Sequence, residues 1–262
     1  MNIINNFNFN IIIYLMVSVI FNQSYKIVTK RNIKDGVLTI LIQFVSSFTC
    51  LIFLPLFELK LPTDFKVYLL LFISIIFYTI NDRLGTTARK GLESSGYIIL
   101  KQMSAVFMIF MGILFFKEPF VLKKFIGSLL IVLSNIIVFL KRGNIKFNKY
   151  LLCGILANIC LTIALFLDVN NSSKFNLSFY VLLTYLIPLI LIFLFERVKI
   201  KDIIKEYKVS NKYALIITGI TWSLMMITKL KLYEIGSVSV VAPLTSLTVI
   251  LNIIVSYFYL KE

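Results

Sequence analysis

The chain of 262 residues contains no histidine and only 12 acidic residues, against 27 lysines and arginines. Histidine is the commonest general base and metal ligand, so its absence removes the residue on which many catalytic and metal sites depend. The acids form no Asp-x-x-Asp pair, although integral-membrane enzymes need clustered carboxylates, histidines or metal ligands. We therefore expect no enzyme, no cofactor and no metal, and keep an integral-membrane enzyme as a remote alternative.

Cysteine is also scarce. Cys50, Cys153 and Cys160 all fall inside apolar runs and lack the spacing of metal ligands. Cysteine in such surroundings behaves as a small buried apolar group. We therefore expect these three residues to serve packing.

Hydrophobic residues, in contrast, make up 59% of the chain, and the mean hydropathy is +0.93. A soluble domain of this length cannot bury so much apolar surface, so we expect lipid to be the solvent. Nine runs without charge recur, each close to the roughly 20 residues that a spanning helix needs. They predict an all-α polytopic membrane protein with nine transmembrane helices, near 8–28, 36–57, 66–90, 94–116, 122–141, 149–168, 176–196, 211–233 and 236–260.

The net charge of +15 does not indicate nucleic acid, because the basic residues lie mainly between the apolar runs. There they fix membrane topology. The connections after the odd-numbered helices carry 18 of them and the other connections 8, which predicts an external N-terminus. Frequent Asn, Ile, Lys, Phe and Tyr are typical of AT-rich coding, and we expect a bacterial plasma membrane. The lipid bilayer and a small-molecule substrate are the expected partners, and a homodimer is left open.

An internal repeat is the most informative pattern. At an offset of 144 residues, Ser95 aligns with Ser239, Leu100 with Leu244, Tyr78 with Trp222, and Lys117-Glu118 with Lys261-Glu262. Five helices separate equivalent points, and this odd number means that the two copies cross the membrane in opposite directions. The sequence therefore predicts two inverted five-helix repeats, at 1–145 and 146–262, the second ending after its fourth helix so that a tenth helix is missing.

The stretch from Leu92 to Leu140, with Lys117-Glu118 and then Gly127, resembles the EamA-type half of the drug/metabolite transporter superfamily. The copy from Ser237 to Glu262, with Ala242-Pro243-Leu244, is similar. The resemblance implies ten helices in two inverted repeats, carriage of metabolites without cofactors, and a cytoplasmic N-terminus. That orientation conflicts with the one that the basic residues predict.

Polar residues inside the apolar runs are the candidate substrate site, because a charge at membrane depth costs about 2.5–3.5 kcal/mol on insertion scales and usually faces a cavity or a partner. Lys101 is expected to hold a carboxylate or phosphate; alternatively it reaches the membrane surface or pairs with Asp82. Pro243 is expected to break its helix and free a backbone carbonyl. The substrate-binding candidates are Lys101, Gln102, Tyr78, Asn81, Trp222, Thr221, Thr245, Ser246, Asn22 and Asn158.

Other charged residues are interpreted as structural. Asp82 with Arg83 has the pattern of a solvated helix end, and Lys229 with Lys231 that of anchors at the membrane surface. The sequence as a whole predicts a secondary transporter, an exporter or exchanger of an amino acid or another polar or anionic metabolite, working by alternating access. A lipid-phosphate flippase or an assembly subunit of the same fold is the alternative.

Overall fold

The computed structural model describes residues 5–115 and 148–260 and six positions between these ranges; the side chains of Ser95, Gln102, Met103, Tyr259 and Leu260 lie outside the description. The described residues are helical and contain no strand. The long helices are α1 (Phe7–Thr29), α2 (Asp35–Phe53), α3 (Phe65–Gly91), α4 (Ser94–Phe115), α6 (Lys149–Val169), α7 (Leu177–Phe195) and α9 (Lys212–Ile235). The short elements are the α-helices α8 (Ile200–Val209), α10 (Val238–Ser246) and α11 (Thr248–Val255), the 3₁₀ helices η2 (Leu54–Leu56) and η3 (Ser172–Lys174), and the π-helix η4 (Ser256–Leu260).

Eight helical segments of the described residues are long and apolar enough to cross a membrane, with Val238–Phe258 counted as one segment. The prediction of an all-α, multi-pass membrane protein is thus confirmed. The remaining expected helix, at 122–141, lies largely outside the described residues, as do Lys117-Glu118 and Lys261-Glu262.

Most long helices begin at a polar residue whose side chain accepts a backbone N–H of the first turn. Asn6, Asp64, Asn148, Asn176 and Asn211 cap α1, α3, α6, α7 and α9 in this way. Such a cap satisfies one of the four N–H groups that a helix leaves without a partner at its start. An asparagine or aspartate cap therefore marks the start of five of these helices.

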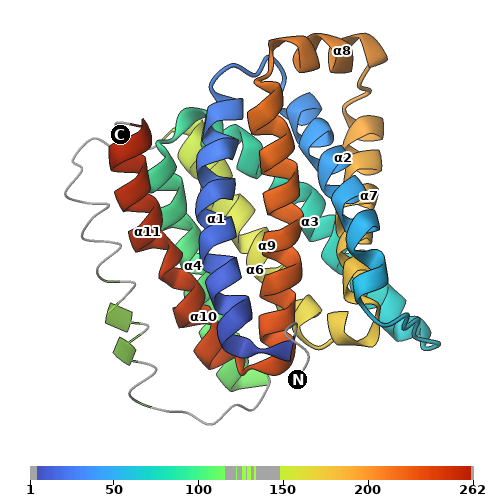
Figure 1. The fold of residues 1–262 in the computed structure, drawn as a ribbon, viewed down its shortest axis with the longest axis vertical. Coiled ribbons are helices and arrows are strands. Elements are labelled where there is room, and N and C mark those ends of the chain that lie inside the picture. Colours follow the sequence, from blue (N-terminus) through green and yellow to red (C-terminus); the bar gives the residue numbers. More distant parts are fainter. Residues whose placement is uncertain are drawn as a thin grey trace.

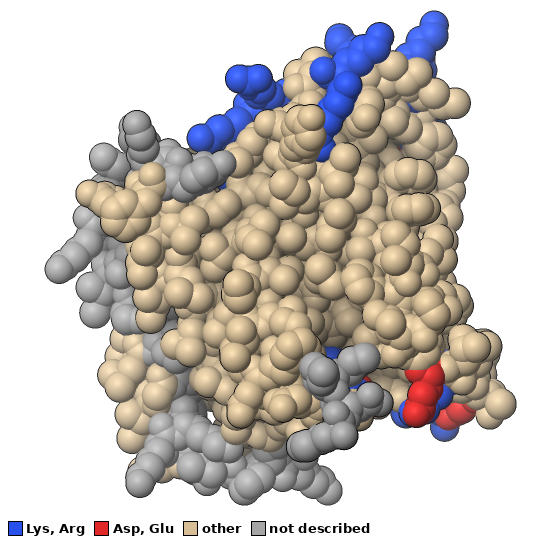
Figure 2. Space-filling model, viewed as in Figure 1, with Lys and Arg blue, Asp and Glu red and all other residues tan. Residues whose placement is uncertain are grey.

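The outer surface of the bundle is apolar. Large side chains such as Met16, Phe44, Phe48 and Phe72 are more than half exposed. In Figure 2 the charged side chains gather at the two ends of the molecule and leave a broad uncharged band between them. A contiguous apolar belt of this kind fits the hydrocarbon of a bilayer.

Inside the bundle, α1 packs along α9 and α3 along α6, while α2 packs against α7 and α9, and α4 against α6 and α10. Figure 1 shows the chain entering α1 at one end and leaving α11 at the other, where α8 also lies. Segments far apart in sequence are thus neighbours, and residues of six helices meet in the interior.

The polar connection 197–212 contains α8, which lies across one end of the bundle (Figure 1). Glu206 of α8 is only 1% exposed. Its carboxylate accepts the backbone N–H of Ile33 at 3.0 Å and that of Lys34 at 2.9 Å, both in the connection between α1 and α2. Lys34 also forms an ion pair of 3.0 Å with Asp202. The amphipathic α8 is therefore fastened to the first half of the chain.

The helix expected at 236–260 is divided into α10 and α11, which meet at Leu247. Pro243 lies inside α10 and has no N–H to donate to the preceding turn. The hydroxyl of Ser246 donates to the carbonyl of Pro243 at 2.5 Å. The break that the sequence places at Pro243 therefore occurs one turn later, close to Ser246.

Candidate functional site

A cavity of about 40 Å³ lies in the interior of the bundle, enough room for about three water-sized molecules. The residues around it come from α1, α3, α4, α6, α7 and α9, and they are mainly aromatic or charged. They are Phe21, Tyr25, Tyr78, Asn81, Asp82, Gly85, Arg89, Tyr97, Lys101, Leu161, Thr184, Tyr185, Trp222, Met225, Met226 and Lys229.

Three of these residues are cations. Arg89 is 7% exposed and Lys229 8% exposed. Lys101 and Lys229 each lie at least six residues from the nearer end of their helices, about 9 Å along the axis. No described acidic side chain lies within 4.0 Å of any of the three charged groups. The cavity therefore collects positive charge that described carboxylates do not neutralise by direct contact.

Aromatic rings hold Arg89 in place. The centre of its guanidinium lies 4.1 Å from the ring centroid of Tyr97 and 4.4 Å from that of Tyr25. Such cation–π contacts are attractive, more so when water is excluded. The Nε of Arg89 is nevertheless buried with no hydrogen-bond partner among the described residues. Because buried N–H groups are almost always paired, this donor is available to a ligand.

Asp82 is the one acid among the described residues around the cavity. It is 4% exposed and accepts hydrogen bonds of 2.8 Å from the side-chain amides of Gln43 and Asn81. The interpretation of Asp82 as a solvated helix end is therefore wrong. Two amide donors stabilise its charge at a depth where water cannot.

A second cavity of about 30 Å³ continues the first one along α1, α4 and α9. Lys101 and Lys229 line both cavities. Residues nearer the start of α1, such as Ser18, and nearer the end of α9, such as Tyr233, line only the second. The two cavities are therefore stacked along the bundle, with the two lysines between them. The interpretation of Lys229 as an anchor at the membrane surface is wrong, because Lys229 faces this interior.

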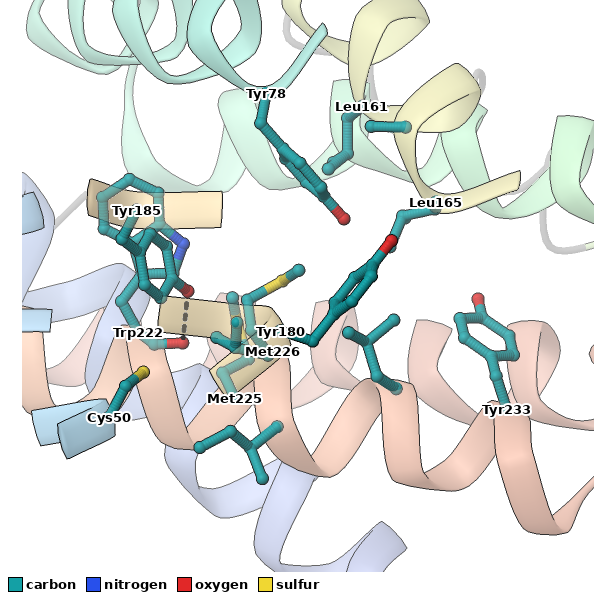
Figure 3. Packing of buried hydrophobic residues seen from close by; sticks show 14 of the residues in the cluster. Cys50, Tyr78, Leu161, Leu165, Tyr180, Tyr185, Trp222, Met225, Met226 and Tyr233 are labelled. Atoms are coloured by element: carbon teal, nitrogen blue, oxygen red, sulfur yellow. Dashed lines mark hydrogen bonds between the residues drawn. The ribbon is translucent and has the colours of Figure 1, made fainter. Parts of the chain in front are cut away.

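Trp222 is the centre of the aromatic wall. Its ring lies 5.0 Å from that of Tyr185, 5.7 Å from that of Phe21 and 5.9 Å from that of Tyr25. The Tyr185 hydroxyl donates to the Trp222 carbonyl at 3.1 Å, the dashed bond in Figure 3. Aromatic pairs at these distances are attractive, so they form a rigid apolar surface beside the cations.

Most of the predicted site residues lie at these cavities. Lys101, Tyr78, Asn81 and Trp222 line the first, and Asn22, Thr245 and Ser246, together with Lys101, line the second. The side chain of Gln102 is outside the described residues.

Two predicted residues line neither cavity. Thr221 donates to the carbonyl of Ile217 at 2.6 Å, and Asn158 to that of Gly154 at 2.7 Å, each within its own helix. Sequence reasoning also missed Arg89, which looks like a basic residue at a helix end. The ring of Tyr97 that covers Arg89 comes from the next helix, so no local pattern signals its burial.

This arrangement can bind an anionic group, since fixed cations face a confined space and the Nε–H of Arg89 has no described hydrogen-bond partner. Aromatic surface beside the charges can contact an apolar part of the same ligand. Among the described residues, no cluster of three or more His, Cys, Asp or Glu could hold a metal ion. In comparisons with known proteins, no protein-family model matches the chain, and no curated protein matches it.

Proposed function

We propose that this protein is a secondary transporter of small anionic metabolites that works by alternating access. The observation that carries the proposal is the meeting of Arg89, Lys101 and Lys229 around one buried cavity with Asp82 as the only described acid there. A charge at this depth costs a few kcal/mol. An anion bound between the cations offsets that cost with charge-assisted hydrogen bonds. The substrate class is therefore a carboxylate, phosphate or similar anion with an apolar part.

The packing of the helices supports two inverted repeats. At the predicted offset of 144 residues, α1 corresponds to α6 and α3 to α9, so the α1–α9 interface corresponds to the α3–α6 interface, and both are extensive. The ends also correspond: α3 ends at Gly91 and α9 at Ile235, while α4 begins at Ser94 and α10 at Val238. This correspondence favours our proposal that the chain resembles the drug/metabolite transporter superfamily.

One pair of hydrogen bonds follows the same relation. The hydroxyl of Ser74 in α3 donates to Asp168 of α6 at 2.5 Å. The hydroxyl of Thr218 in α9 donates to Ser24 of α1 at 2.9 Å. Both partners of the second bond stand 144 residues from those of the first. In inverted-repeat carriers the substrate site lies between the repeats, near the membrane midplane, and the stacked cavities lie between these two interfaces.

The fluorescence of Trp222 offers a direct test, because Trp222 is the only tryptophan of the chain and lines the cavity. The probes are benzenesulfonate and trimethylanilinium, which combine one ring with permanent charges of opposite sign. We expect benzenesulfonate, phenyl phosphate or both to change the fluorescence of the purified protein in nanodiscs, and trimethylanilinium to have no effect. Binding of the cation alone would contradict the proposal.

A variant pair ties the binding to the cavity. Lys101→Ala is expected to weaken anion binding about tenfold or more, since a hydrogen bond to a charged group contributes about 1.5–3 kcal/mol. Lys201→Ala is the matched control, because Lys201 is exposed on α8. Equal loss in both variants would contradict the site. Binding of a phosphate only when it carries a lipid tail would favour the flippase alternative.

A further inference from the structure

A second buried carboxylate lies behind the wall of the cavity. Asp168 of α6 is fully buried and accepts three hydroxyl hydrogen bonds: from Ser74 at 2.5 Å, from Tyr78 at 2.6 Å and from Tyr180 at 2.6 Å. The donors belong to α3 and α7 and are themselves buried. No described Lys or Arg lies within 4.0 Å of Asp168. This acid therefore has hydrogen-bond donors but no described counter-charge in contact.

Packing does not require a carboxylate at this position. In the corresponding α1–α9 interface, Ser24 stands where α6 has Asp168, and Thr218 replaces Ser74 as the donor. A neutral hydroxyl thus holds the same kind of helix contact in the other half of the chain. A buried ionisable group that the fold does not need is costly to keep, and in membrane carriers such groups often move protons.

Tyr78 connects Asp168 with the cavity. Tyr78 is one of the residues that line the cavity, and its hydroxyl donates to Oδ2 of Asp168. Figure 3 shows the hydroxyl groups of Tyr78 and Tyr180 converging beside α6. Tyr78 and Tyr180 are the titratable groups that face Asp168 from α3 and α7, and no charged group of another described element interacts with it. Only Tyr78 of these two also reaches the cavity.

We propose that Asp168 binds the proton that moves with the anionic substrate, and that Tyr78 couples the two binding events. The proton adds to Oδ2 of Asp168, which then donates its new O–H to the Tyr78 oxygen. The Tyr78 O–H no longer donates its hydrogen bond to Oδ2. It rotates toward the cavity and donates a hydrogen bond to the anion instead. Release of the proton reverses these steps, and no other atom or electron is exchanged.

The proposal rests on the proposed anion site. It can be measured because the binding of the proton and the binding of the anion are thermodynamically linked. If the proton and the anion favour each other's binding, each raises the affinity of the other by the same factor. Benzenesulfonate keeps its charge at all pH values used, so any pH dependence of its binding belongs to the protein. With one proton taken up per anion, its affinity is expected to rise by up to about tenfold for each unit that the pH falls.

The experiment measures benzenesulfonate binding by Trp222 fluorescence across pH in wild type, Asp168→Ser and Asp168→Asn. Asp168→Ser installs the residue of the corresponding interface, and Asp168→Asn keeps the shape of the side chain. Asp82, Lys101 and Lys229 also line the cavity and contribute a pH dependence of their own. We therefore expect both variants to bind the anion with a pH slope smaller than that of wild type by up to the contribution of one proton. Tyr78→Phe should show the same reduced pH slope while Asp168 still takes up its proton.

Infrared spectroscopy follows the proton itself, and needs no ligand. The C=O band of a protonated carboxyl group is expected to appear in wild type and Tyr78→Phe as the pH falls, and to be missing in Asp168→Asn. Asp82→Asn separates the band of Asp168 from that of Asp82. A band unchanged by Asp168→Asn, or an equal pH slope in the Asp168 variants and wild type, would overturn the proposal.

The outcomes also separate this inference from the proposed function. Benzenesulfonate binding that depends on Lys101 but not on pH would leave the anion site standing and remove the role of Asp168. Absence of binding by benzenesulfonate, phenyl phosphate and inorganic phosphate alike would overturn both, whatever the infrared band does.

Discussion

Trp222 and Ser223 are neighbours on α9 with opposite surroundings. The Trp222 ring contacts three other aromatic rings at the cavity, whereas the Ser223 hydroxyl donates to the Gly219 carbonyl at 3.1 Å within its own helix. Only one of the two can contact a substrate in the cavity. Such a difference between adjacent residues separates binding from folding in a mutational test.

We expect Trp222→Ala to weaken the binding of benzenesulfonate by about two- to tenfold, because an aromatic pair contributes about 0.5–1.5 kcal/mol beyond its buried area. Ser223→Ala should leave binding unchanged. Calorimetry is the suitable measurement, since the variant lacks the fluorescent residue. Equal affinities of the two variants would remove Trp222 from the site.

How far the site can be predicted from sequence depends on where a residue stands in its helix. Lys101 interrupts an apolar run, so its cost in lipid marks it at once. Asp82 and Arg89 stand among Arg83, Lys90 and other polar residues, a pattern that a solvated helix end also has. The packing of α1, α2 and α4 against α3 buries them, and a local sequence pattern does not show these contacts.

Among the elements, α8 joins the second half of the chain to the first through a buried carboxylate. Its Glu206 accepts backbone N–H groups of Ile33 and Lys34, and no water competes because the carboxylate is buried. A hydrogen bond to a charged acceptor is roughly twice as strong as a neutral one. The connection between α1 and α2 is therefore held by charge as well as by shape.

Glu206→Gln is expected to weaken this attachment by on the order of 1 kcal/mol, since it replaces a charged acceptor with a neutral one. The amides of Ile33 and Lys34 should then exchange their hydrogens about fivefold faster. Hydrogen exchange followed by mass spectrometry measures this directly.

Asp202→Asn is the matched control, because it removes a partly exposed carboxylate of the same helix. The hydrogen bond from Lys34 lowers the pKa of Asp202, and the Asp202 side chain remains partly exposed to solvent. Exchange at Ile33 that stays as slow in Glu206→Gln as in Asp202→Asn would contradict the role of Glu206.

The positions of the long helices can be predicted from the sequence more closely than the positions of the breaks and of the short helix α8. The apolar runs locate α1, α2, α3, α4, α6, α7 and α9 to within a few residues, because lipid forces each backbone to bond within its own segment. The position of the break near Ser246 and the fold of 197–212 as α8 depend on contacts between helices. Run length and charge do not contain that information.

For the whole molecule, the end that carries α8 is rich in Lys and Arg (Figure 2). The positive-inside rule predicts that this end faces the cytoplasm. Arg31 and Lys60 are exposed in connections at opposite ends. In a chain whose three cysteines are replaced by alanine, we expect an impermeant maleimide added to intact cells to label Lys60→Cys and not Arg31→Cys. The reverse result would favour the orientation that the family resemblance implies.

The attachment of α8 makes the two ends of the molecule mechanically unequal. At the end of the molecule that carries α8, the carboxylate of Glu206 joins the second half of the chain to the first. At the opposite end, a cavity of about 420 Å³ lies among Asn5, Phe57, Lys231 and Glu234. Separation of the halves at the α8 end has to break hydrogen bonds to the buried carboxylate of Glu206. At the far end, neutral hydrogen bonds from Asn176 to the carbonyls of Leu54 and Phe57 join the halves instead. In an alternating carrier, the half-cycle that opens the α8 end would then break hydrogen bonds to a buried charge, and the other half-cycle would break hydrogen bonds between neutral groups.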